Sequence, residues 1–141
     1  MAPVGDDIRA DFLRRGRNAI VATNRMGAGP QLTPNWYLWD GERFLISTAD
    51  GTAKVRNLRR DPHMSLCIDD ALSTGELYVT AYGPGEIIAG PDAREPSLAI
   101  IRKYRAEELV VPHWNGINRR NDRVVIALRP ERWVWGDWLR P

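Results

Sequence analysis

The sequence predicts a mainly β protein, a small antiparallel barrel with peripheral helices. Three observations support this prediction. About six short runs have strand character and follow one another mostly in hairpin order, and two or three helices are inserted between them. Strands and helices do not alternate one by one, which disfavours a doubly wound parallel sheet. The length of 141 residues and the apolar content of 43% suit a single domain over residues 1–141.

The first third of the chain is expected to form one helix and three strands. Residues 5–15 carry apolar side chains at helical spacing, with acidic residues first and arginines last, as the helix dipole favours. Residues 18–23 form a short apolar run that is typical of a buried strand. Residues 31–39 alternate, and an Asp-Gly turn joins them to a strand at 43–48, so we expect these two strands to pair as a hairpin.

The rest of the chain continues the same mixture. Gly83 and Gly85 permit a bend or bulge in the longest of the expected strands. The expected segments are a short helix from about Ala53 that ends at Pro62, strands at 63–69 and 76–88, a helix within 91–105, an irregular basic stretch at 106–121, and a last strand at 123–128 with a tryptophan-rich extension.

Charge and residue counts argue against several classes of protein. The net charge of +2 is too small for a protein that lies on a nucleic-acid backbone, although arginines cluster at 56–60 and 119–123. The single cysteine, Cys67, rules out an internal disulfide, and with His63 and His113 it makes no persuasive metal site. No apolar stretch is long enough to span a membrane, and the acidic start is unlike a signal peptide. We therefore expect a cytoplasmic protein with no metal, membrane or nucleic-acid partner.

The turn after the strand at 43–48 is a candidate anion site. Ser47 and Thr48 end this strand, and Thr52 is placed to be the N-cap of the helix that begins at about Ala53. The first N–H groups of a helix have no intrahelical partners, and together with the helix dipole they bind phosphate readily. Lys54 lies in that first turn, where the dipole disfavours a cation unless an anion is bound.

An ordinary structural interpretation of the same turn remains open. Asp50 or Thr52 could cap the helix by itself. Lys54 would then belong to a solvated basic face together with the arginines at 56–60.

The expected strand at 31–39 contains a proline. Pro34 cannot donate to a ladder, so it indicates an edge strand or a bulge. Gln31, Thr33 and Asn35 share one face by alternation and could present amides and a hydroxyl to a flat polar ring. The alternative is a purely structural bulge at the barrel rim. If the hairpin forms, this polar face lies near the turn that carries Lys54.

Residues 29–70, GPQLTPNWYLWDGERFLISTADGTAKVRNLRRDPHMSLCIDD, resemble a known family. It is the deazaflavin (F420)-dependent branch of the pyridoxamine-phosphate-oxidase-like split-barrel proteins. The resemblance covers about residues 6–136 and is strongest from Gly29 to Pro62. It implies a six-stranded antiparallel split β-barrel of the FMN-binding-like kind. It also implies a homodimer with a cofactor in each of two grooves at the subunit interface.

The resemblance also implies roles for particular residues. Tyr78 matches an aromatic position that faces the other subunit's cofactor, and it is a possible proton donor. Arg56 would help to position the cofactor tail. The implied cofactor-binding residues are Ser47, Thr48, Thr52, Ala53 and Lys54 for the phosphate, Gln31, Thr33, Pro34 and Asn35 for the ring system, and Asn57 near the helix that follows.

The function implied is F420H2-dependent reduction, in which hydride passes between C5 of the deazaflavin and a small unsaturated or quinone-like substrate. The alternatives are an FMN-dependent oxidoreductase of the same family and a non-catalytic protein that binds or sequesters F420. No convincing Ser-His-Asp set or pair of acids competes with cofactor chemistry. A proton could also come from water or His113. Several aromatic residues could stack on the substrate, or could instead pack in the core or a dimer interface: Tyr37, Tyr78, Trp114, Trp133 and Trp135. Part of the face that carries Trp133, Trp135 and Trp138 is expected to contact a partner subunit.

Overall fold

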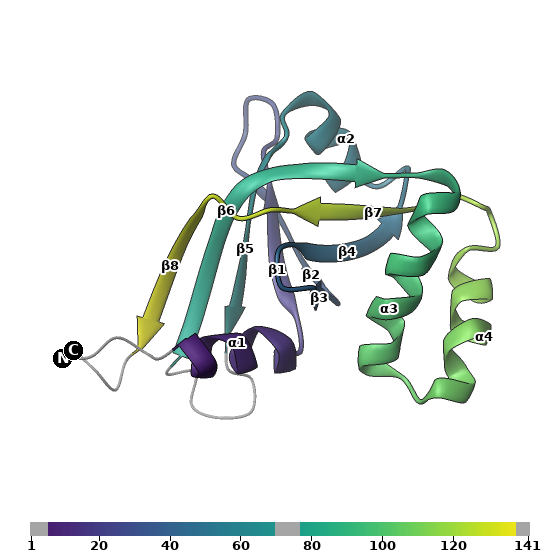
Figure 1. Cartoon of the computed structure of the whole chain (residues 1–141). Coiled ribbons are helices and arrows are strands. Elements are labelled where there is room, and N and C mark those ends of the chain that lie inside the picture. The colour runs from purple at the N-terminus through teal and green to yellow at the C-terminus, as the bar shows by residue number, and fades with distance from the viewer. Residues whose placement is uncertain (1–5, 70–76, 138–141) are drawn as a thin grey trace.

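The computed structural model describes residues 6–69 and 77–137, and it has the predicted mainly β architecture. One antiparallel sheet curls into a half-barrel, with α1 across one end and α3 and α4 side by side on its outer face (Figure 1). The elements are α1 (Asp6–Arg15), β1 (Ala19–Thr23), β2 (Gln31–Asn35), β3 (Leu38–Trp39), β4 (Phe44–Ala49), α2 (Ala53–Arg60), β5 (His63–Asp69), β6 (Leu77–Ile88), the short 3-10 helix η1 (Gly90–Ala93), α3 (Arg94–Tyr104), α4 (Glu107–Ile117), β7 (Arg123–Leu128) and β8 (Arg132–Asp137).

The long strand β6 joins the two halves of the sheet. The strand order is β2-β1-β5-β6-β7-β4-β3, and β8 also pairs with β6. Residues 77–84 of β6 pair with β5 and β8, whereas residues 85–88 pair with β7. A Cβ on Gly83 would lie 2.5 Å from the Arg129 carbonyl oxygen, and one on Gly85 would lie 2.4 Å from Met64 Sδ. At Gly83 the neighbouring backbone therefore leaves no room for a side chain, whereas at Gly85 the Met64 side chain would have to move.

The predicted hairpin between residues 31–39 and 43–48 is only partly correct. Residues 31–35 pair with β1, and only Leu38 and Trp39 pair with β4. The chain leaves one ladder for the other at Tyr37, whose backbone groups bond to side chains of α3. The Tyr37 N–H donates to Tyr104 Oη at 3.1 Å, and Lys103 Nζ donates to the Tyr37 carbonyl oxygen at 3.0 Å. Because side chains of α3 pair with the N–H and carbonyl groups of Tyr37, the strand can be interrupted at this residue without leaving buried polar atoms unpaired.

Two other segments differ from expectation. The stretch expected to be irregular contains the helix α4, in which Val110 and Trp114 are buried against α3. Pro112 lies inside this helix, and a proline argues against a helix when only the sequence is read. The packing of the apolar face of α4 compensates for the backbone hydrogen bond that Pro112 cannot form. The tryptophan-rich extension is also a strand in its own right, β8. With β3 separate from β2, the described sheet has eight strands rather than six.

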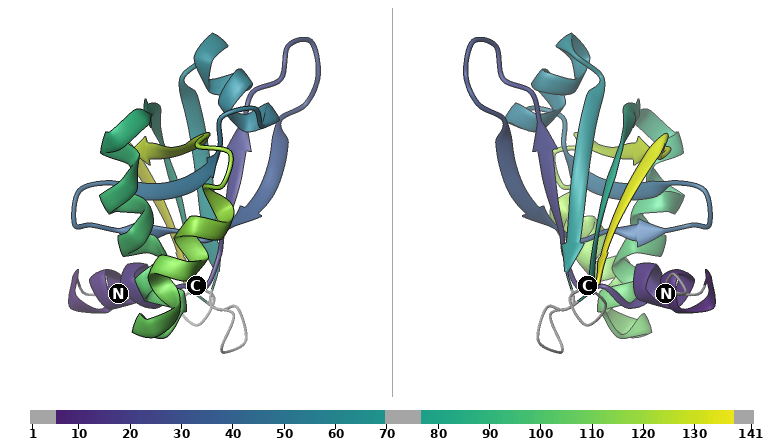
Figure 2. Two further views of the ribbon diagram at one scale, coloured as in Figure 1. Left: turned by 90° about the vertical axis from the view of Figure 1, so that its right-hand side faces the viewer. Right: turned by 90° about the vertical axis from the view of Figure 1, so that its left-hand side faces the viewer.

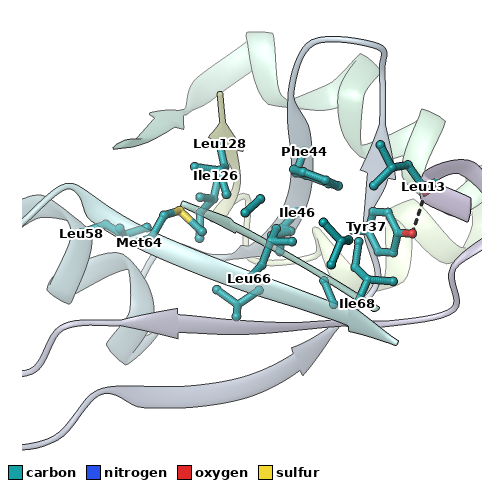
Figure 3. Close-up of a cluster of buried hydrophobic side chains, with 14 of the residues drawn as sticks. Leu13, Tyr37, Phe44, Ile46, Leu58, Met64, Leu66, Ile68, Ile126 and Leu128 are labelled. Atoms are coloured by element: carbon teal, nitrogen blue, oxygen red, sulfur yellow. Dashed lines mark hydrogen bonds between the residues drawn. The ribbon is translucent and has the colours of Figure 1, made fainter. Parts of the chain in front are cut away.

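The core lies inside the half-barrel, where apolar residues from all the strands except β2 meet Phe12 and Leu13 of α1 and Val55 and Leu58 of α2 (Figure 3). Tyr37 is fully buried in this core, and its hydroxyl donates to the Leu13 carbonyl oxygen at 2.7 Å. Burial and the nearby Tyr104 raise the pKa of Tyr37, so the hydroxyl stays a protonated donor. A second apolar layer lies on the outer face of the sheet, between β4, β7 and α3.

Replacing Tyr37 with Phe should lower the free energy of unfolding by about 1–2 kcal/mol, because the Leu13 carbonyl group loses its buried donor. Urea denaturation measures the change. The control is Val111→Ala on α4, since Val111 is 45% exposed, and it should change stability by less than about 0.5 kcal/mol. Equal effects of the two substitutions would contradict the role given to this hydrogen bond.

Candidate functional site

The corner at which β4 leads into α2 has backbone donors that no cap uses. Thr52 is the N-cap residue, but its hydroxyl donates to the Ala49 carbonyl oxygen at 3.0 Å and accepts no N–H of the first turn. Asp50 does not cap the helix either, because its Oδ1 lies 2.6 Å from Arg59 Nη2 in an ion pair. That contact is too poorly aligned for a hydrogen bond. Neither cap proposed in the ordinary interpretation is formed, so the first-turn N–H groups remain available to an anion.

Lys54 adds a cation to this corner. It is only 8% exposed, and the first turn of α2 contains no acidic residue. Burial, and then the charge of Arg123, lower the pKa of Lys54. No carboxylate within residues 6–69 and 77–137 forms an ion pair with it. A largely buried lysine at the positive end of a helix, near a second cation, is an arrangement that an anionic ligand would stabilise.

Arg123 is the residue that sequence reasoning missed at this corner. Its Nε and Nη2 atoms donate to Ser47 Oγ at 3.3 and 3.1 Å, and Ser97 Oγ donates to the same oxygen at 3.3 Å. Its own N–H donates to Asn118 Oδ1. Burial lowers the pKa of Arg123, and Asp122 opposes this effect. The only sequence signal was the cluster of arginines at 119–123, which was considered only in connection with nucleic-acid binding, a function that the net charge argues against.

The predicted phosphate residues do not all face the same side. Thr48 points into the barrel and donates to Thr52 Oγ1 at 3.4 Å. Ser47 points to the opposite face of β4, toward α3, as alternation along a strand requires. Ala53 is the first residue of α2, so it contributes backbone rather than side-chain groups. Ser47 is therefore connected to the corner only indirectly, by its hydrogen bonds with Arg123.

The polar face of β2 is half-buried at the sheet edge, where the proline predicted it. Thr33 Oγ1 donates to Asn35 Oδ1 at 2.9 Å. Gln31 Oε1 accepts from Thr23 Oγ1 at 3.4 Å. Because both amide oxygens are used as acceptors, the two side chains have N–H groups left to donate. Pro34 is exposed on the other face of this strand, opposite Ile20.

Thr23 connects the strand β2 to the corner. This side chain is 1% exposed, and it accepts a hydrogen bond from Asn57 Nδ2 at 3.1 Å while it donates to Gln31. Asn57 belongs to α2, which lies at the same end of the molecule as the β1–β2 connection (Figures 1 and 2). The polar strand and the helix start are therefore brought together through β1 rather than through the expected hairpin. In the sequence, the feature that could have indicated this role of Thr23 is its position as a polar residue at the end of an apolar strand.

The aromatic residues and the histidine considered for the substrate site do not lie together in the structure. Trp114 is buried between α3 and α4, and Trp133 and Trp135 pack against the barrel core, so all three contribute to packing within the chain. Trp138 lies outside the described residues. His113 is half-exposed and stacks on Trp36 with 5.5 Å between ring centroids, and burial and nearby arginines lower its pKa.

Tyr78 lies on the outer face of the sheet, over Gly136 of β8. A Cβ on Gly136 would come within 2.0 Å of the Tyr78 ring. Arg56 is exposed and donates to the Gly51 carbonyl oxygen at 2.6 Å.

Among the described residues no cluster of three His, Cys, Asp or Glu side chains could hold a metal ion. None of their helices is long and apolar enough to cross a membrane. The chemistry that these residues offer is binding: backbone N–H groups and a cation for an anion, and amide N–H groups for the polar edge of a ring.

Comparison with known proteins identifies the family. The chain is similar to the conserved hypothetical protein Rv2991 from Mycobacterium tuberculosis, with a TM-score of 0.80, 27% identity, and coverage of 96% of this chain and 86% of the other. It is also similar to an F420 reductase, with a TM-score of 0.74, 24% identity, and coverage of 94% and 98%. General Stress Protein 26 from Bacillus anthracis matches with a TM-score of 0.66 and 14% identity over 90% and 89% of the two chains. Residues 6–134 match the family model described as pyridoxamine 5'-phosphate oxidase, and the chain therefore belongs to this family.

Proposed function

We propose that this protein is an F420H2-dependent oxidoreductase that reduces a small unsaturated or quinone-like compound. The observation that carries this proposal is the uncapped start of α2 with the largely buried Lys54 beside it, which has no ion-pair partner among the described residues. Membership of the pyridoxamine 5'-phosphate oxidase family supports a redox cofactor, and the similarity to an F420 reductase supports a deazaflavin. When bound, F420 supplies hydride transfer at C5 of its ring.

The chain's own residues would bind and orient the cofactor. The first-turn N–H groups and Lys54 would hold the phosphate, with the Thr52 hydroxyl at the same corner. The amides of Gln31 and Asn35 would donate to the polar edge of the ring system. Thr23 fixes Gln31 relative to Asn57 of α2, so the spacing between the ring site and the phosphate site is set inside the protein.

The second candidate is an FMN-dependent oxidoreductase, which the family model favours. The corner at α2 would accept the phosphate of either cofactor. A third possibility is a non-catalytic protein that binds or sequesters F420. These candidates differ in which cofactor binds and in whether turnover follows.

Titration of the purified protein with F420 and with FMN, followed by absorbance and fluorescence, separates the cofactors. We expect saturable binding of F420 and much weaker binding of FMN. The loaded protein, supplied with reduced F420 and a panel of enones and quinones, should oxidise the cofactor. Tight binding of FMN with none of F420 would overturn the proposed cofactor. Tight F420 binding with no turnover of any compound would favour the sequestering protein.

Replacing Lys54 with Met should weaken F420 binding by about 1–3 kcal/mol, because it removes a charge-assisted contact to the phosphate. The matched control is Arg102→Gln, an exposed cation on α3 that should leave the affinity unchanged.

The chain has two lysines, Lys54 and Lys103, so lysine-labelled NMR resolves both. The pKa of Lys54 is lowered in the free protein, and a bound dianion should raise it, whereas Lys103 should shift less. A Lys54 resonance that does not respond to F420 would remove this residue from the site.

We further propose that the protein is a homodimer that pairs through the outer face of β1, β2, β6 and β8. Four apolar side chains are exposed on this face: Ile20 (42%), Leu32 (61%), Tyr82 (43%) and Val134 (36%). Exposed apolar side chains gathered on one face of a sheet are a feature of protein–protein interfaces. Tyr78 lies on the same face, so a second subunit would place it toward the partner's cofactor groove, where it could donate a proton.

Leu32→Asp should convert the dimer into a monomer, because it would bury a carboxylate in an apolar interface. Light scattering coupled to size-exclusion chromatography measures the mass. The control is Ile8→Asp on α1, since Ile8 is also exposed, at 53%, but lies outside this face. A wild-type protein that elutes as a monomer at high concentration would contradict the proposed assembly.

A further inference from the structure

A second hollow lies at the end of the half-barrel away from the corner at which α2 begins. It is lined by Arg9 and Leu13 of α1 and by Trp133 and Trp135 of β8. Helix α1 lies across one end of the sheet, and α2 lies at the other end (Figure 1). The hollow has a volume of about 460 Å³, within the range of small-molecule sites, roughly 300–1,000 Å³. None of its four lining residues takes part in the proposed cofactor site, so the hollow needs an explanation of its own.

The two tryptophans form fixed aromatic walls. Their rings are nearly parallel, with 6.1 Å between the centroids and an interplanar angle of 15°. The Trp135 ring meets Phe12 edge to face at 5.9 Å, and the Trp133 ring meets Trp39 in the same way at 5.4 Å. Both tryptophans pack against the core, yet both are only partly buried. Core packing therefore fixes the two rings and leaves part of their surface to line the hollow.

Arg9 brings a positive charge to these aromatic walls. Its guanidinium carbon lies 4.9 Å from the centroid of the Trp135 ring, which is a cation–π contact. Within the described part of the chain Arg9 forms no hydrogen bond and no ion pair, and its Nε atom is buried without a partner. On the same helix, Arg14 and Arg15 both pair with Asp11. The contact with the ring does not replace the hydrogen bonds that buried N–H groups require, so Arg9 is placed to bind a carboxylate.

We propose that this hollow, which we call the α1–β8 site, binds a planar aromatic carboxylic acid. The ring system of the ligand would lie against Trp133 and Trp135, next to Leu13. Its carboxylate would accept hydrogen bonds from the Arg9 guanidinium group. The described lining residues include a cation and no acid, which favours an anion, and the tryptophan rings favour a flat apolar body. Because the site is separate from the start of α2, the acid would bind together with a cofactor rather than in its place.

Calorimetric titration with β-naphthoate, and with its neutral amide β-naphthamide, tests this site. Wild-type protein should bind the acid about tenfold more tightly than the amide, the low end for a charge-assisted hydrogen bond, because Arg9 is partly exposed. Arg9→Gln should abolish this preference, and added salt should reduce it in wild-type protein. The matched control is Arg14→Gln, an exposed arginine on the same helix, which should keep the preference. Lys54→Met should keep it as well, because Lys54 lies at the other site.

A second measurement locates the ligand and needs only wild-type protein, so it decides the question even if Arg9→Gln does not fold. In protein with isotope-labelled tryptophan, β-naphthoate should shift the indole N–H resonances of Trp133 and Trp135. The resonances of Trp36 and Trp114 should not move, since these residues pack in the helical layer.

Equal affinity of wild-type protein for the acid and the amide would overturn the proposal. So would resonances of Trp133 and Trp135 that do not respond to the acid. Loss of acid binding in Lys54→Met but not in Arg9→Gln would place the acid at the start of α2 and would also overturn it. The proposed cofactor is tested separately by the F420 and FMN titrations, so either proposal can fail without the other.

Discussion

The constraint on which the candidate site depends is the burial of Lys54 at the positive end of α2, with a second cation, Arg123, near it. Lys54 is nearly buried, and the charge of Arg123 is close enough to lower its pKa. A protein gains nothing from holding two such charges together unless something negative joins them, because burial of an unpaired charge costs free energy. The helix adds its own positive end, and its cap residues use their side chains elsewhere. Every other feature of the site is positioned relative to this corner.

The barrel determines what lies next to the corner. Thr23 is buried at the end of β1 and bonds on one side to Asn57 of α2 and on the other to Gln31 of β2. These two contacts make the polar edge strand and the anion corner parts of one rigid arrangement. On the other face of the sheet, Ser47 Oγ accepts from the Arg123 guanidinium group and from Ser97 of α3, which connects Arg123 to the helical layer. The site thus joins the inside of the half-barrel to its outer helices.

Much of this could be predicted from the sequence, because the signals were local. The strand–turn–helix pattern around Lys54 and the proline in β2 are local features, and the structure has both where they were expected. The partner of β2 and the helix α4 could not be predicted in this way. The first depends on Tyr37 finding hydrogen-bond partners on α3, 67 residues away, and the second on packing that outweighs Pro112. Arg123 was missed for the same reason, since its role comes from contacts 76 residues away at Ser47.

The path of β6 through both halves of the sheet has a consequence for motion. A strand that pairs with β5 and β8 along its first part and with β7 along its last cannot move with one half alone. Opening the barrel therefore requires breaking whole ladders at once, which favours cooperative over partial unfolding. The edge strand β2 is tied on one side only, within the described sheet. Local opening should therefore be most frequent at β2, so amide hydrogen exchange should be slow in β6 and faster in β2.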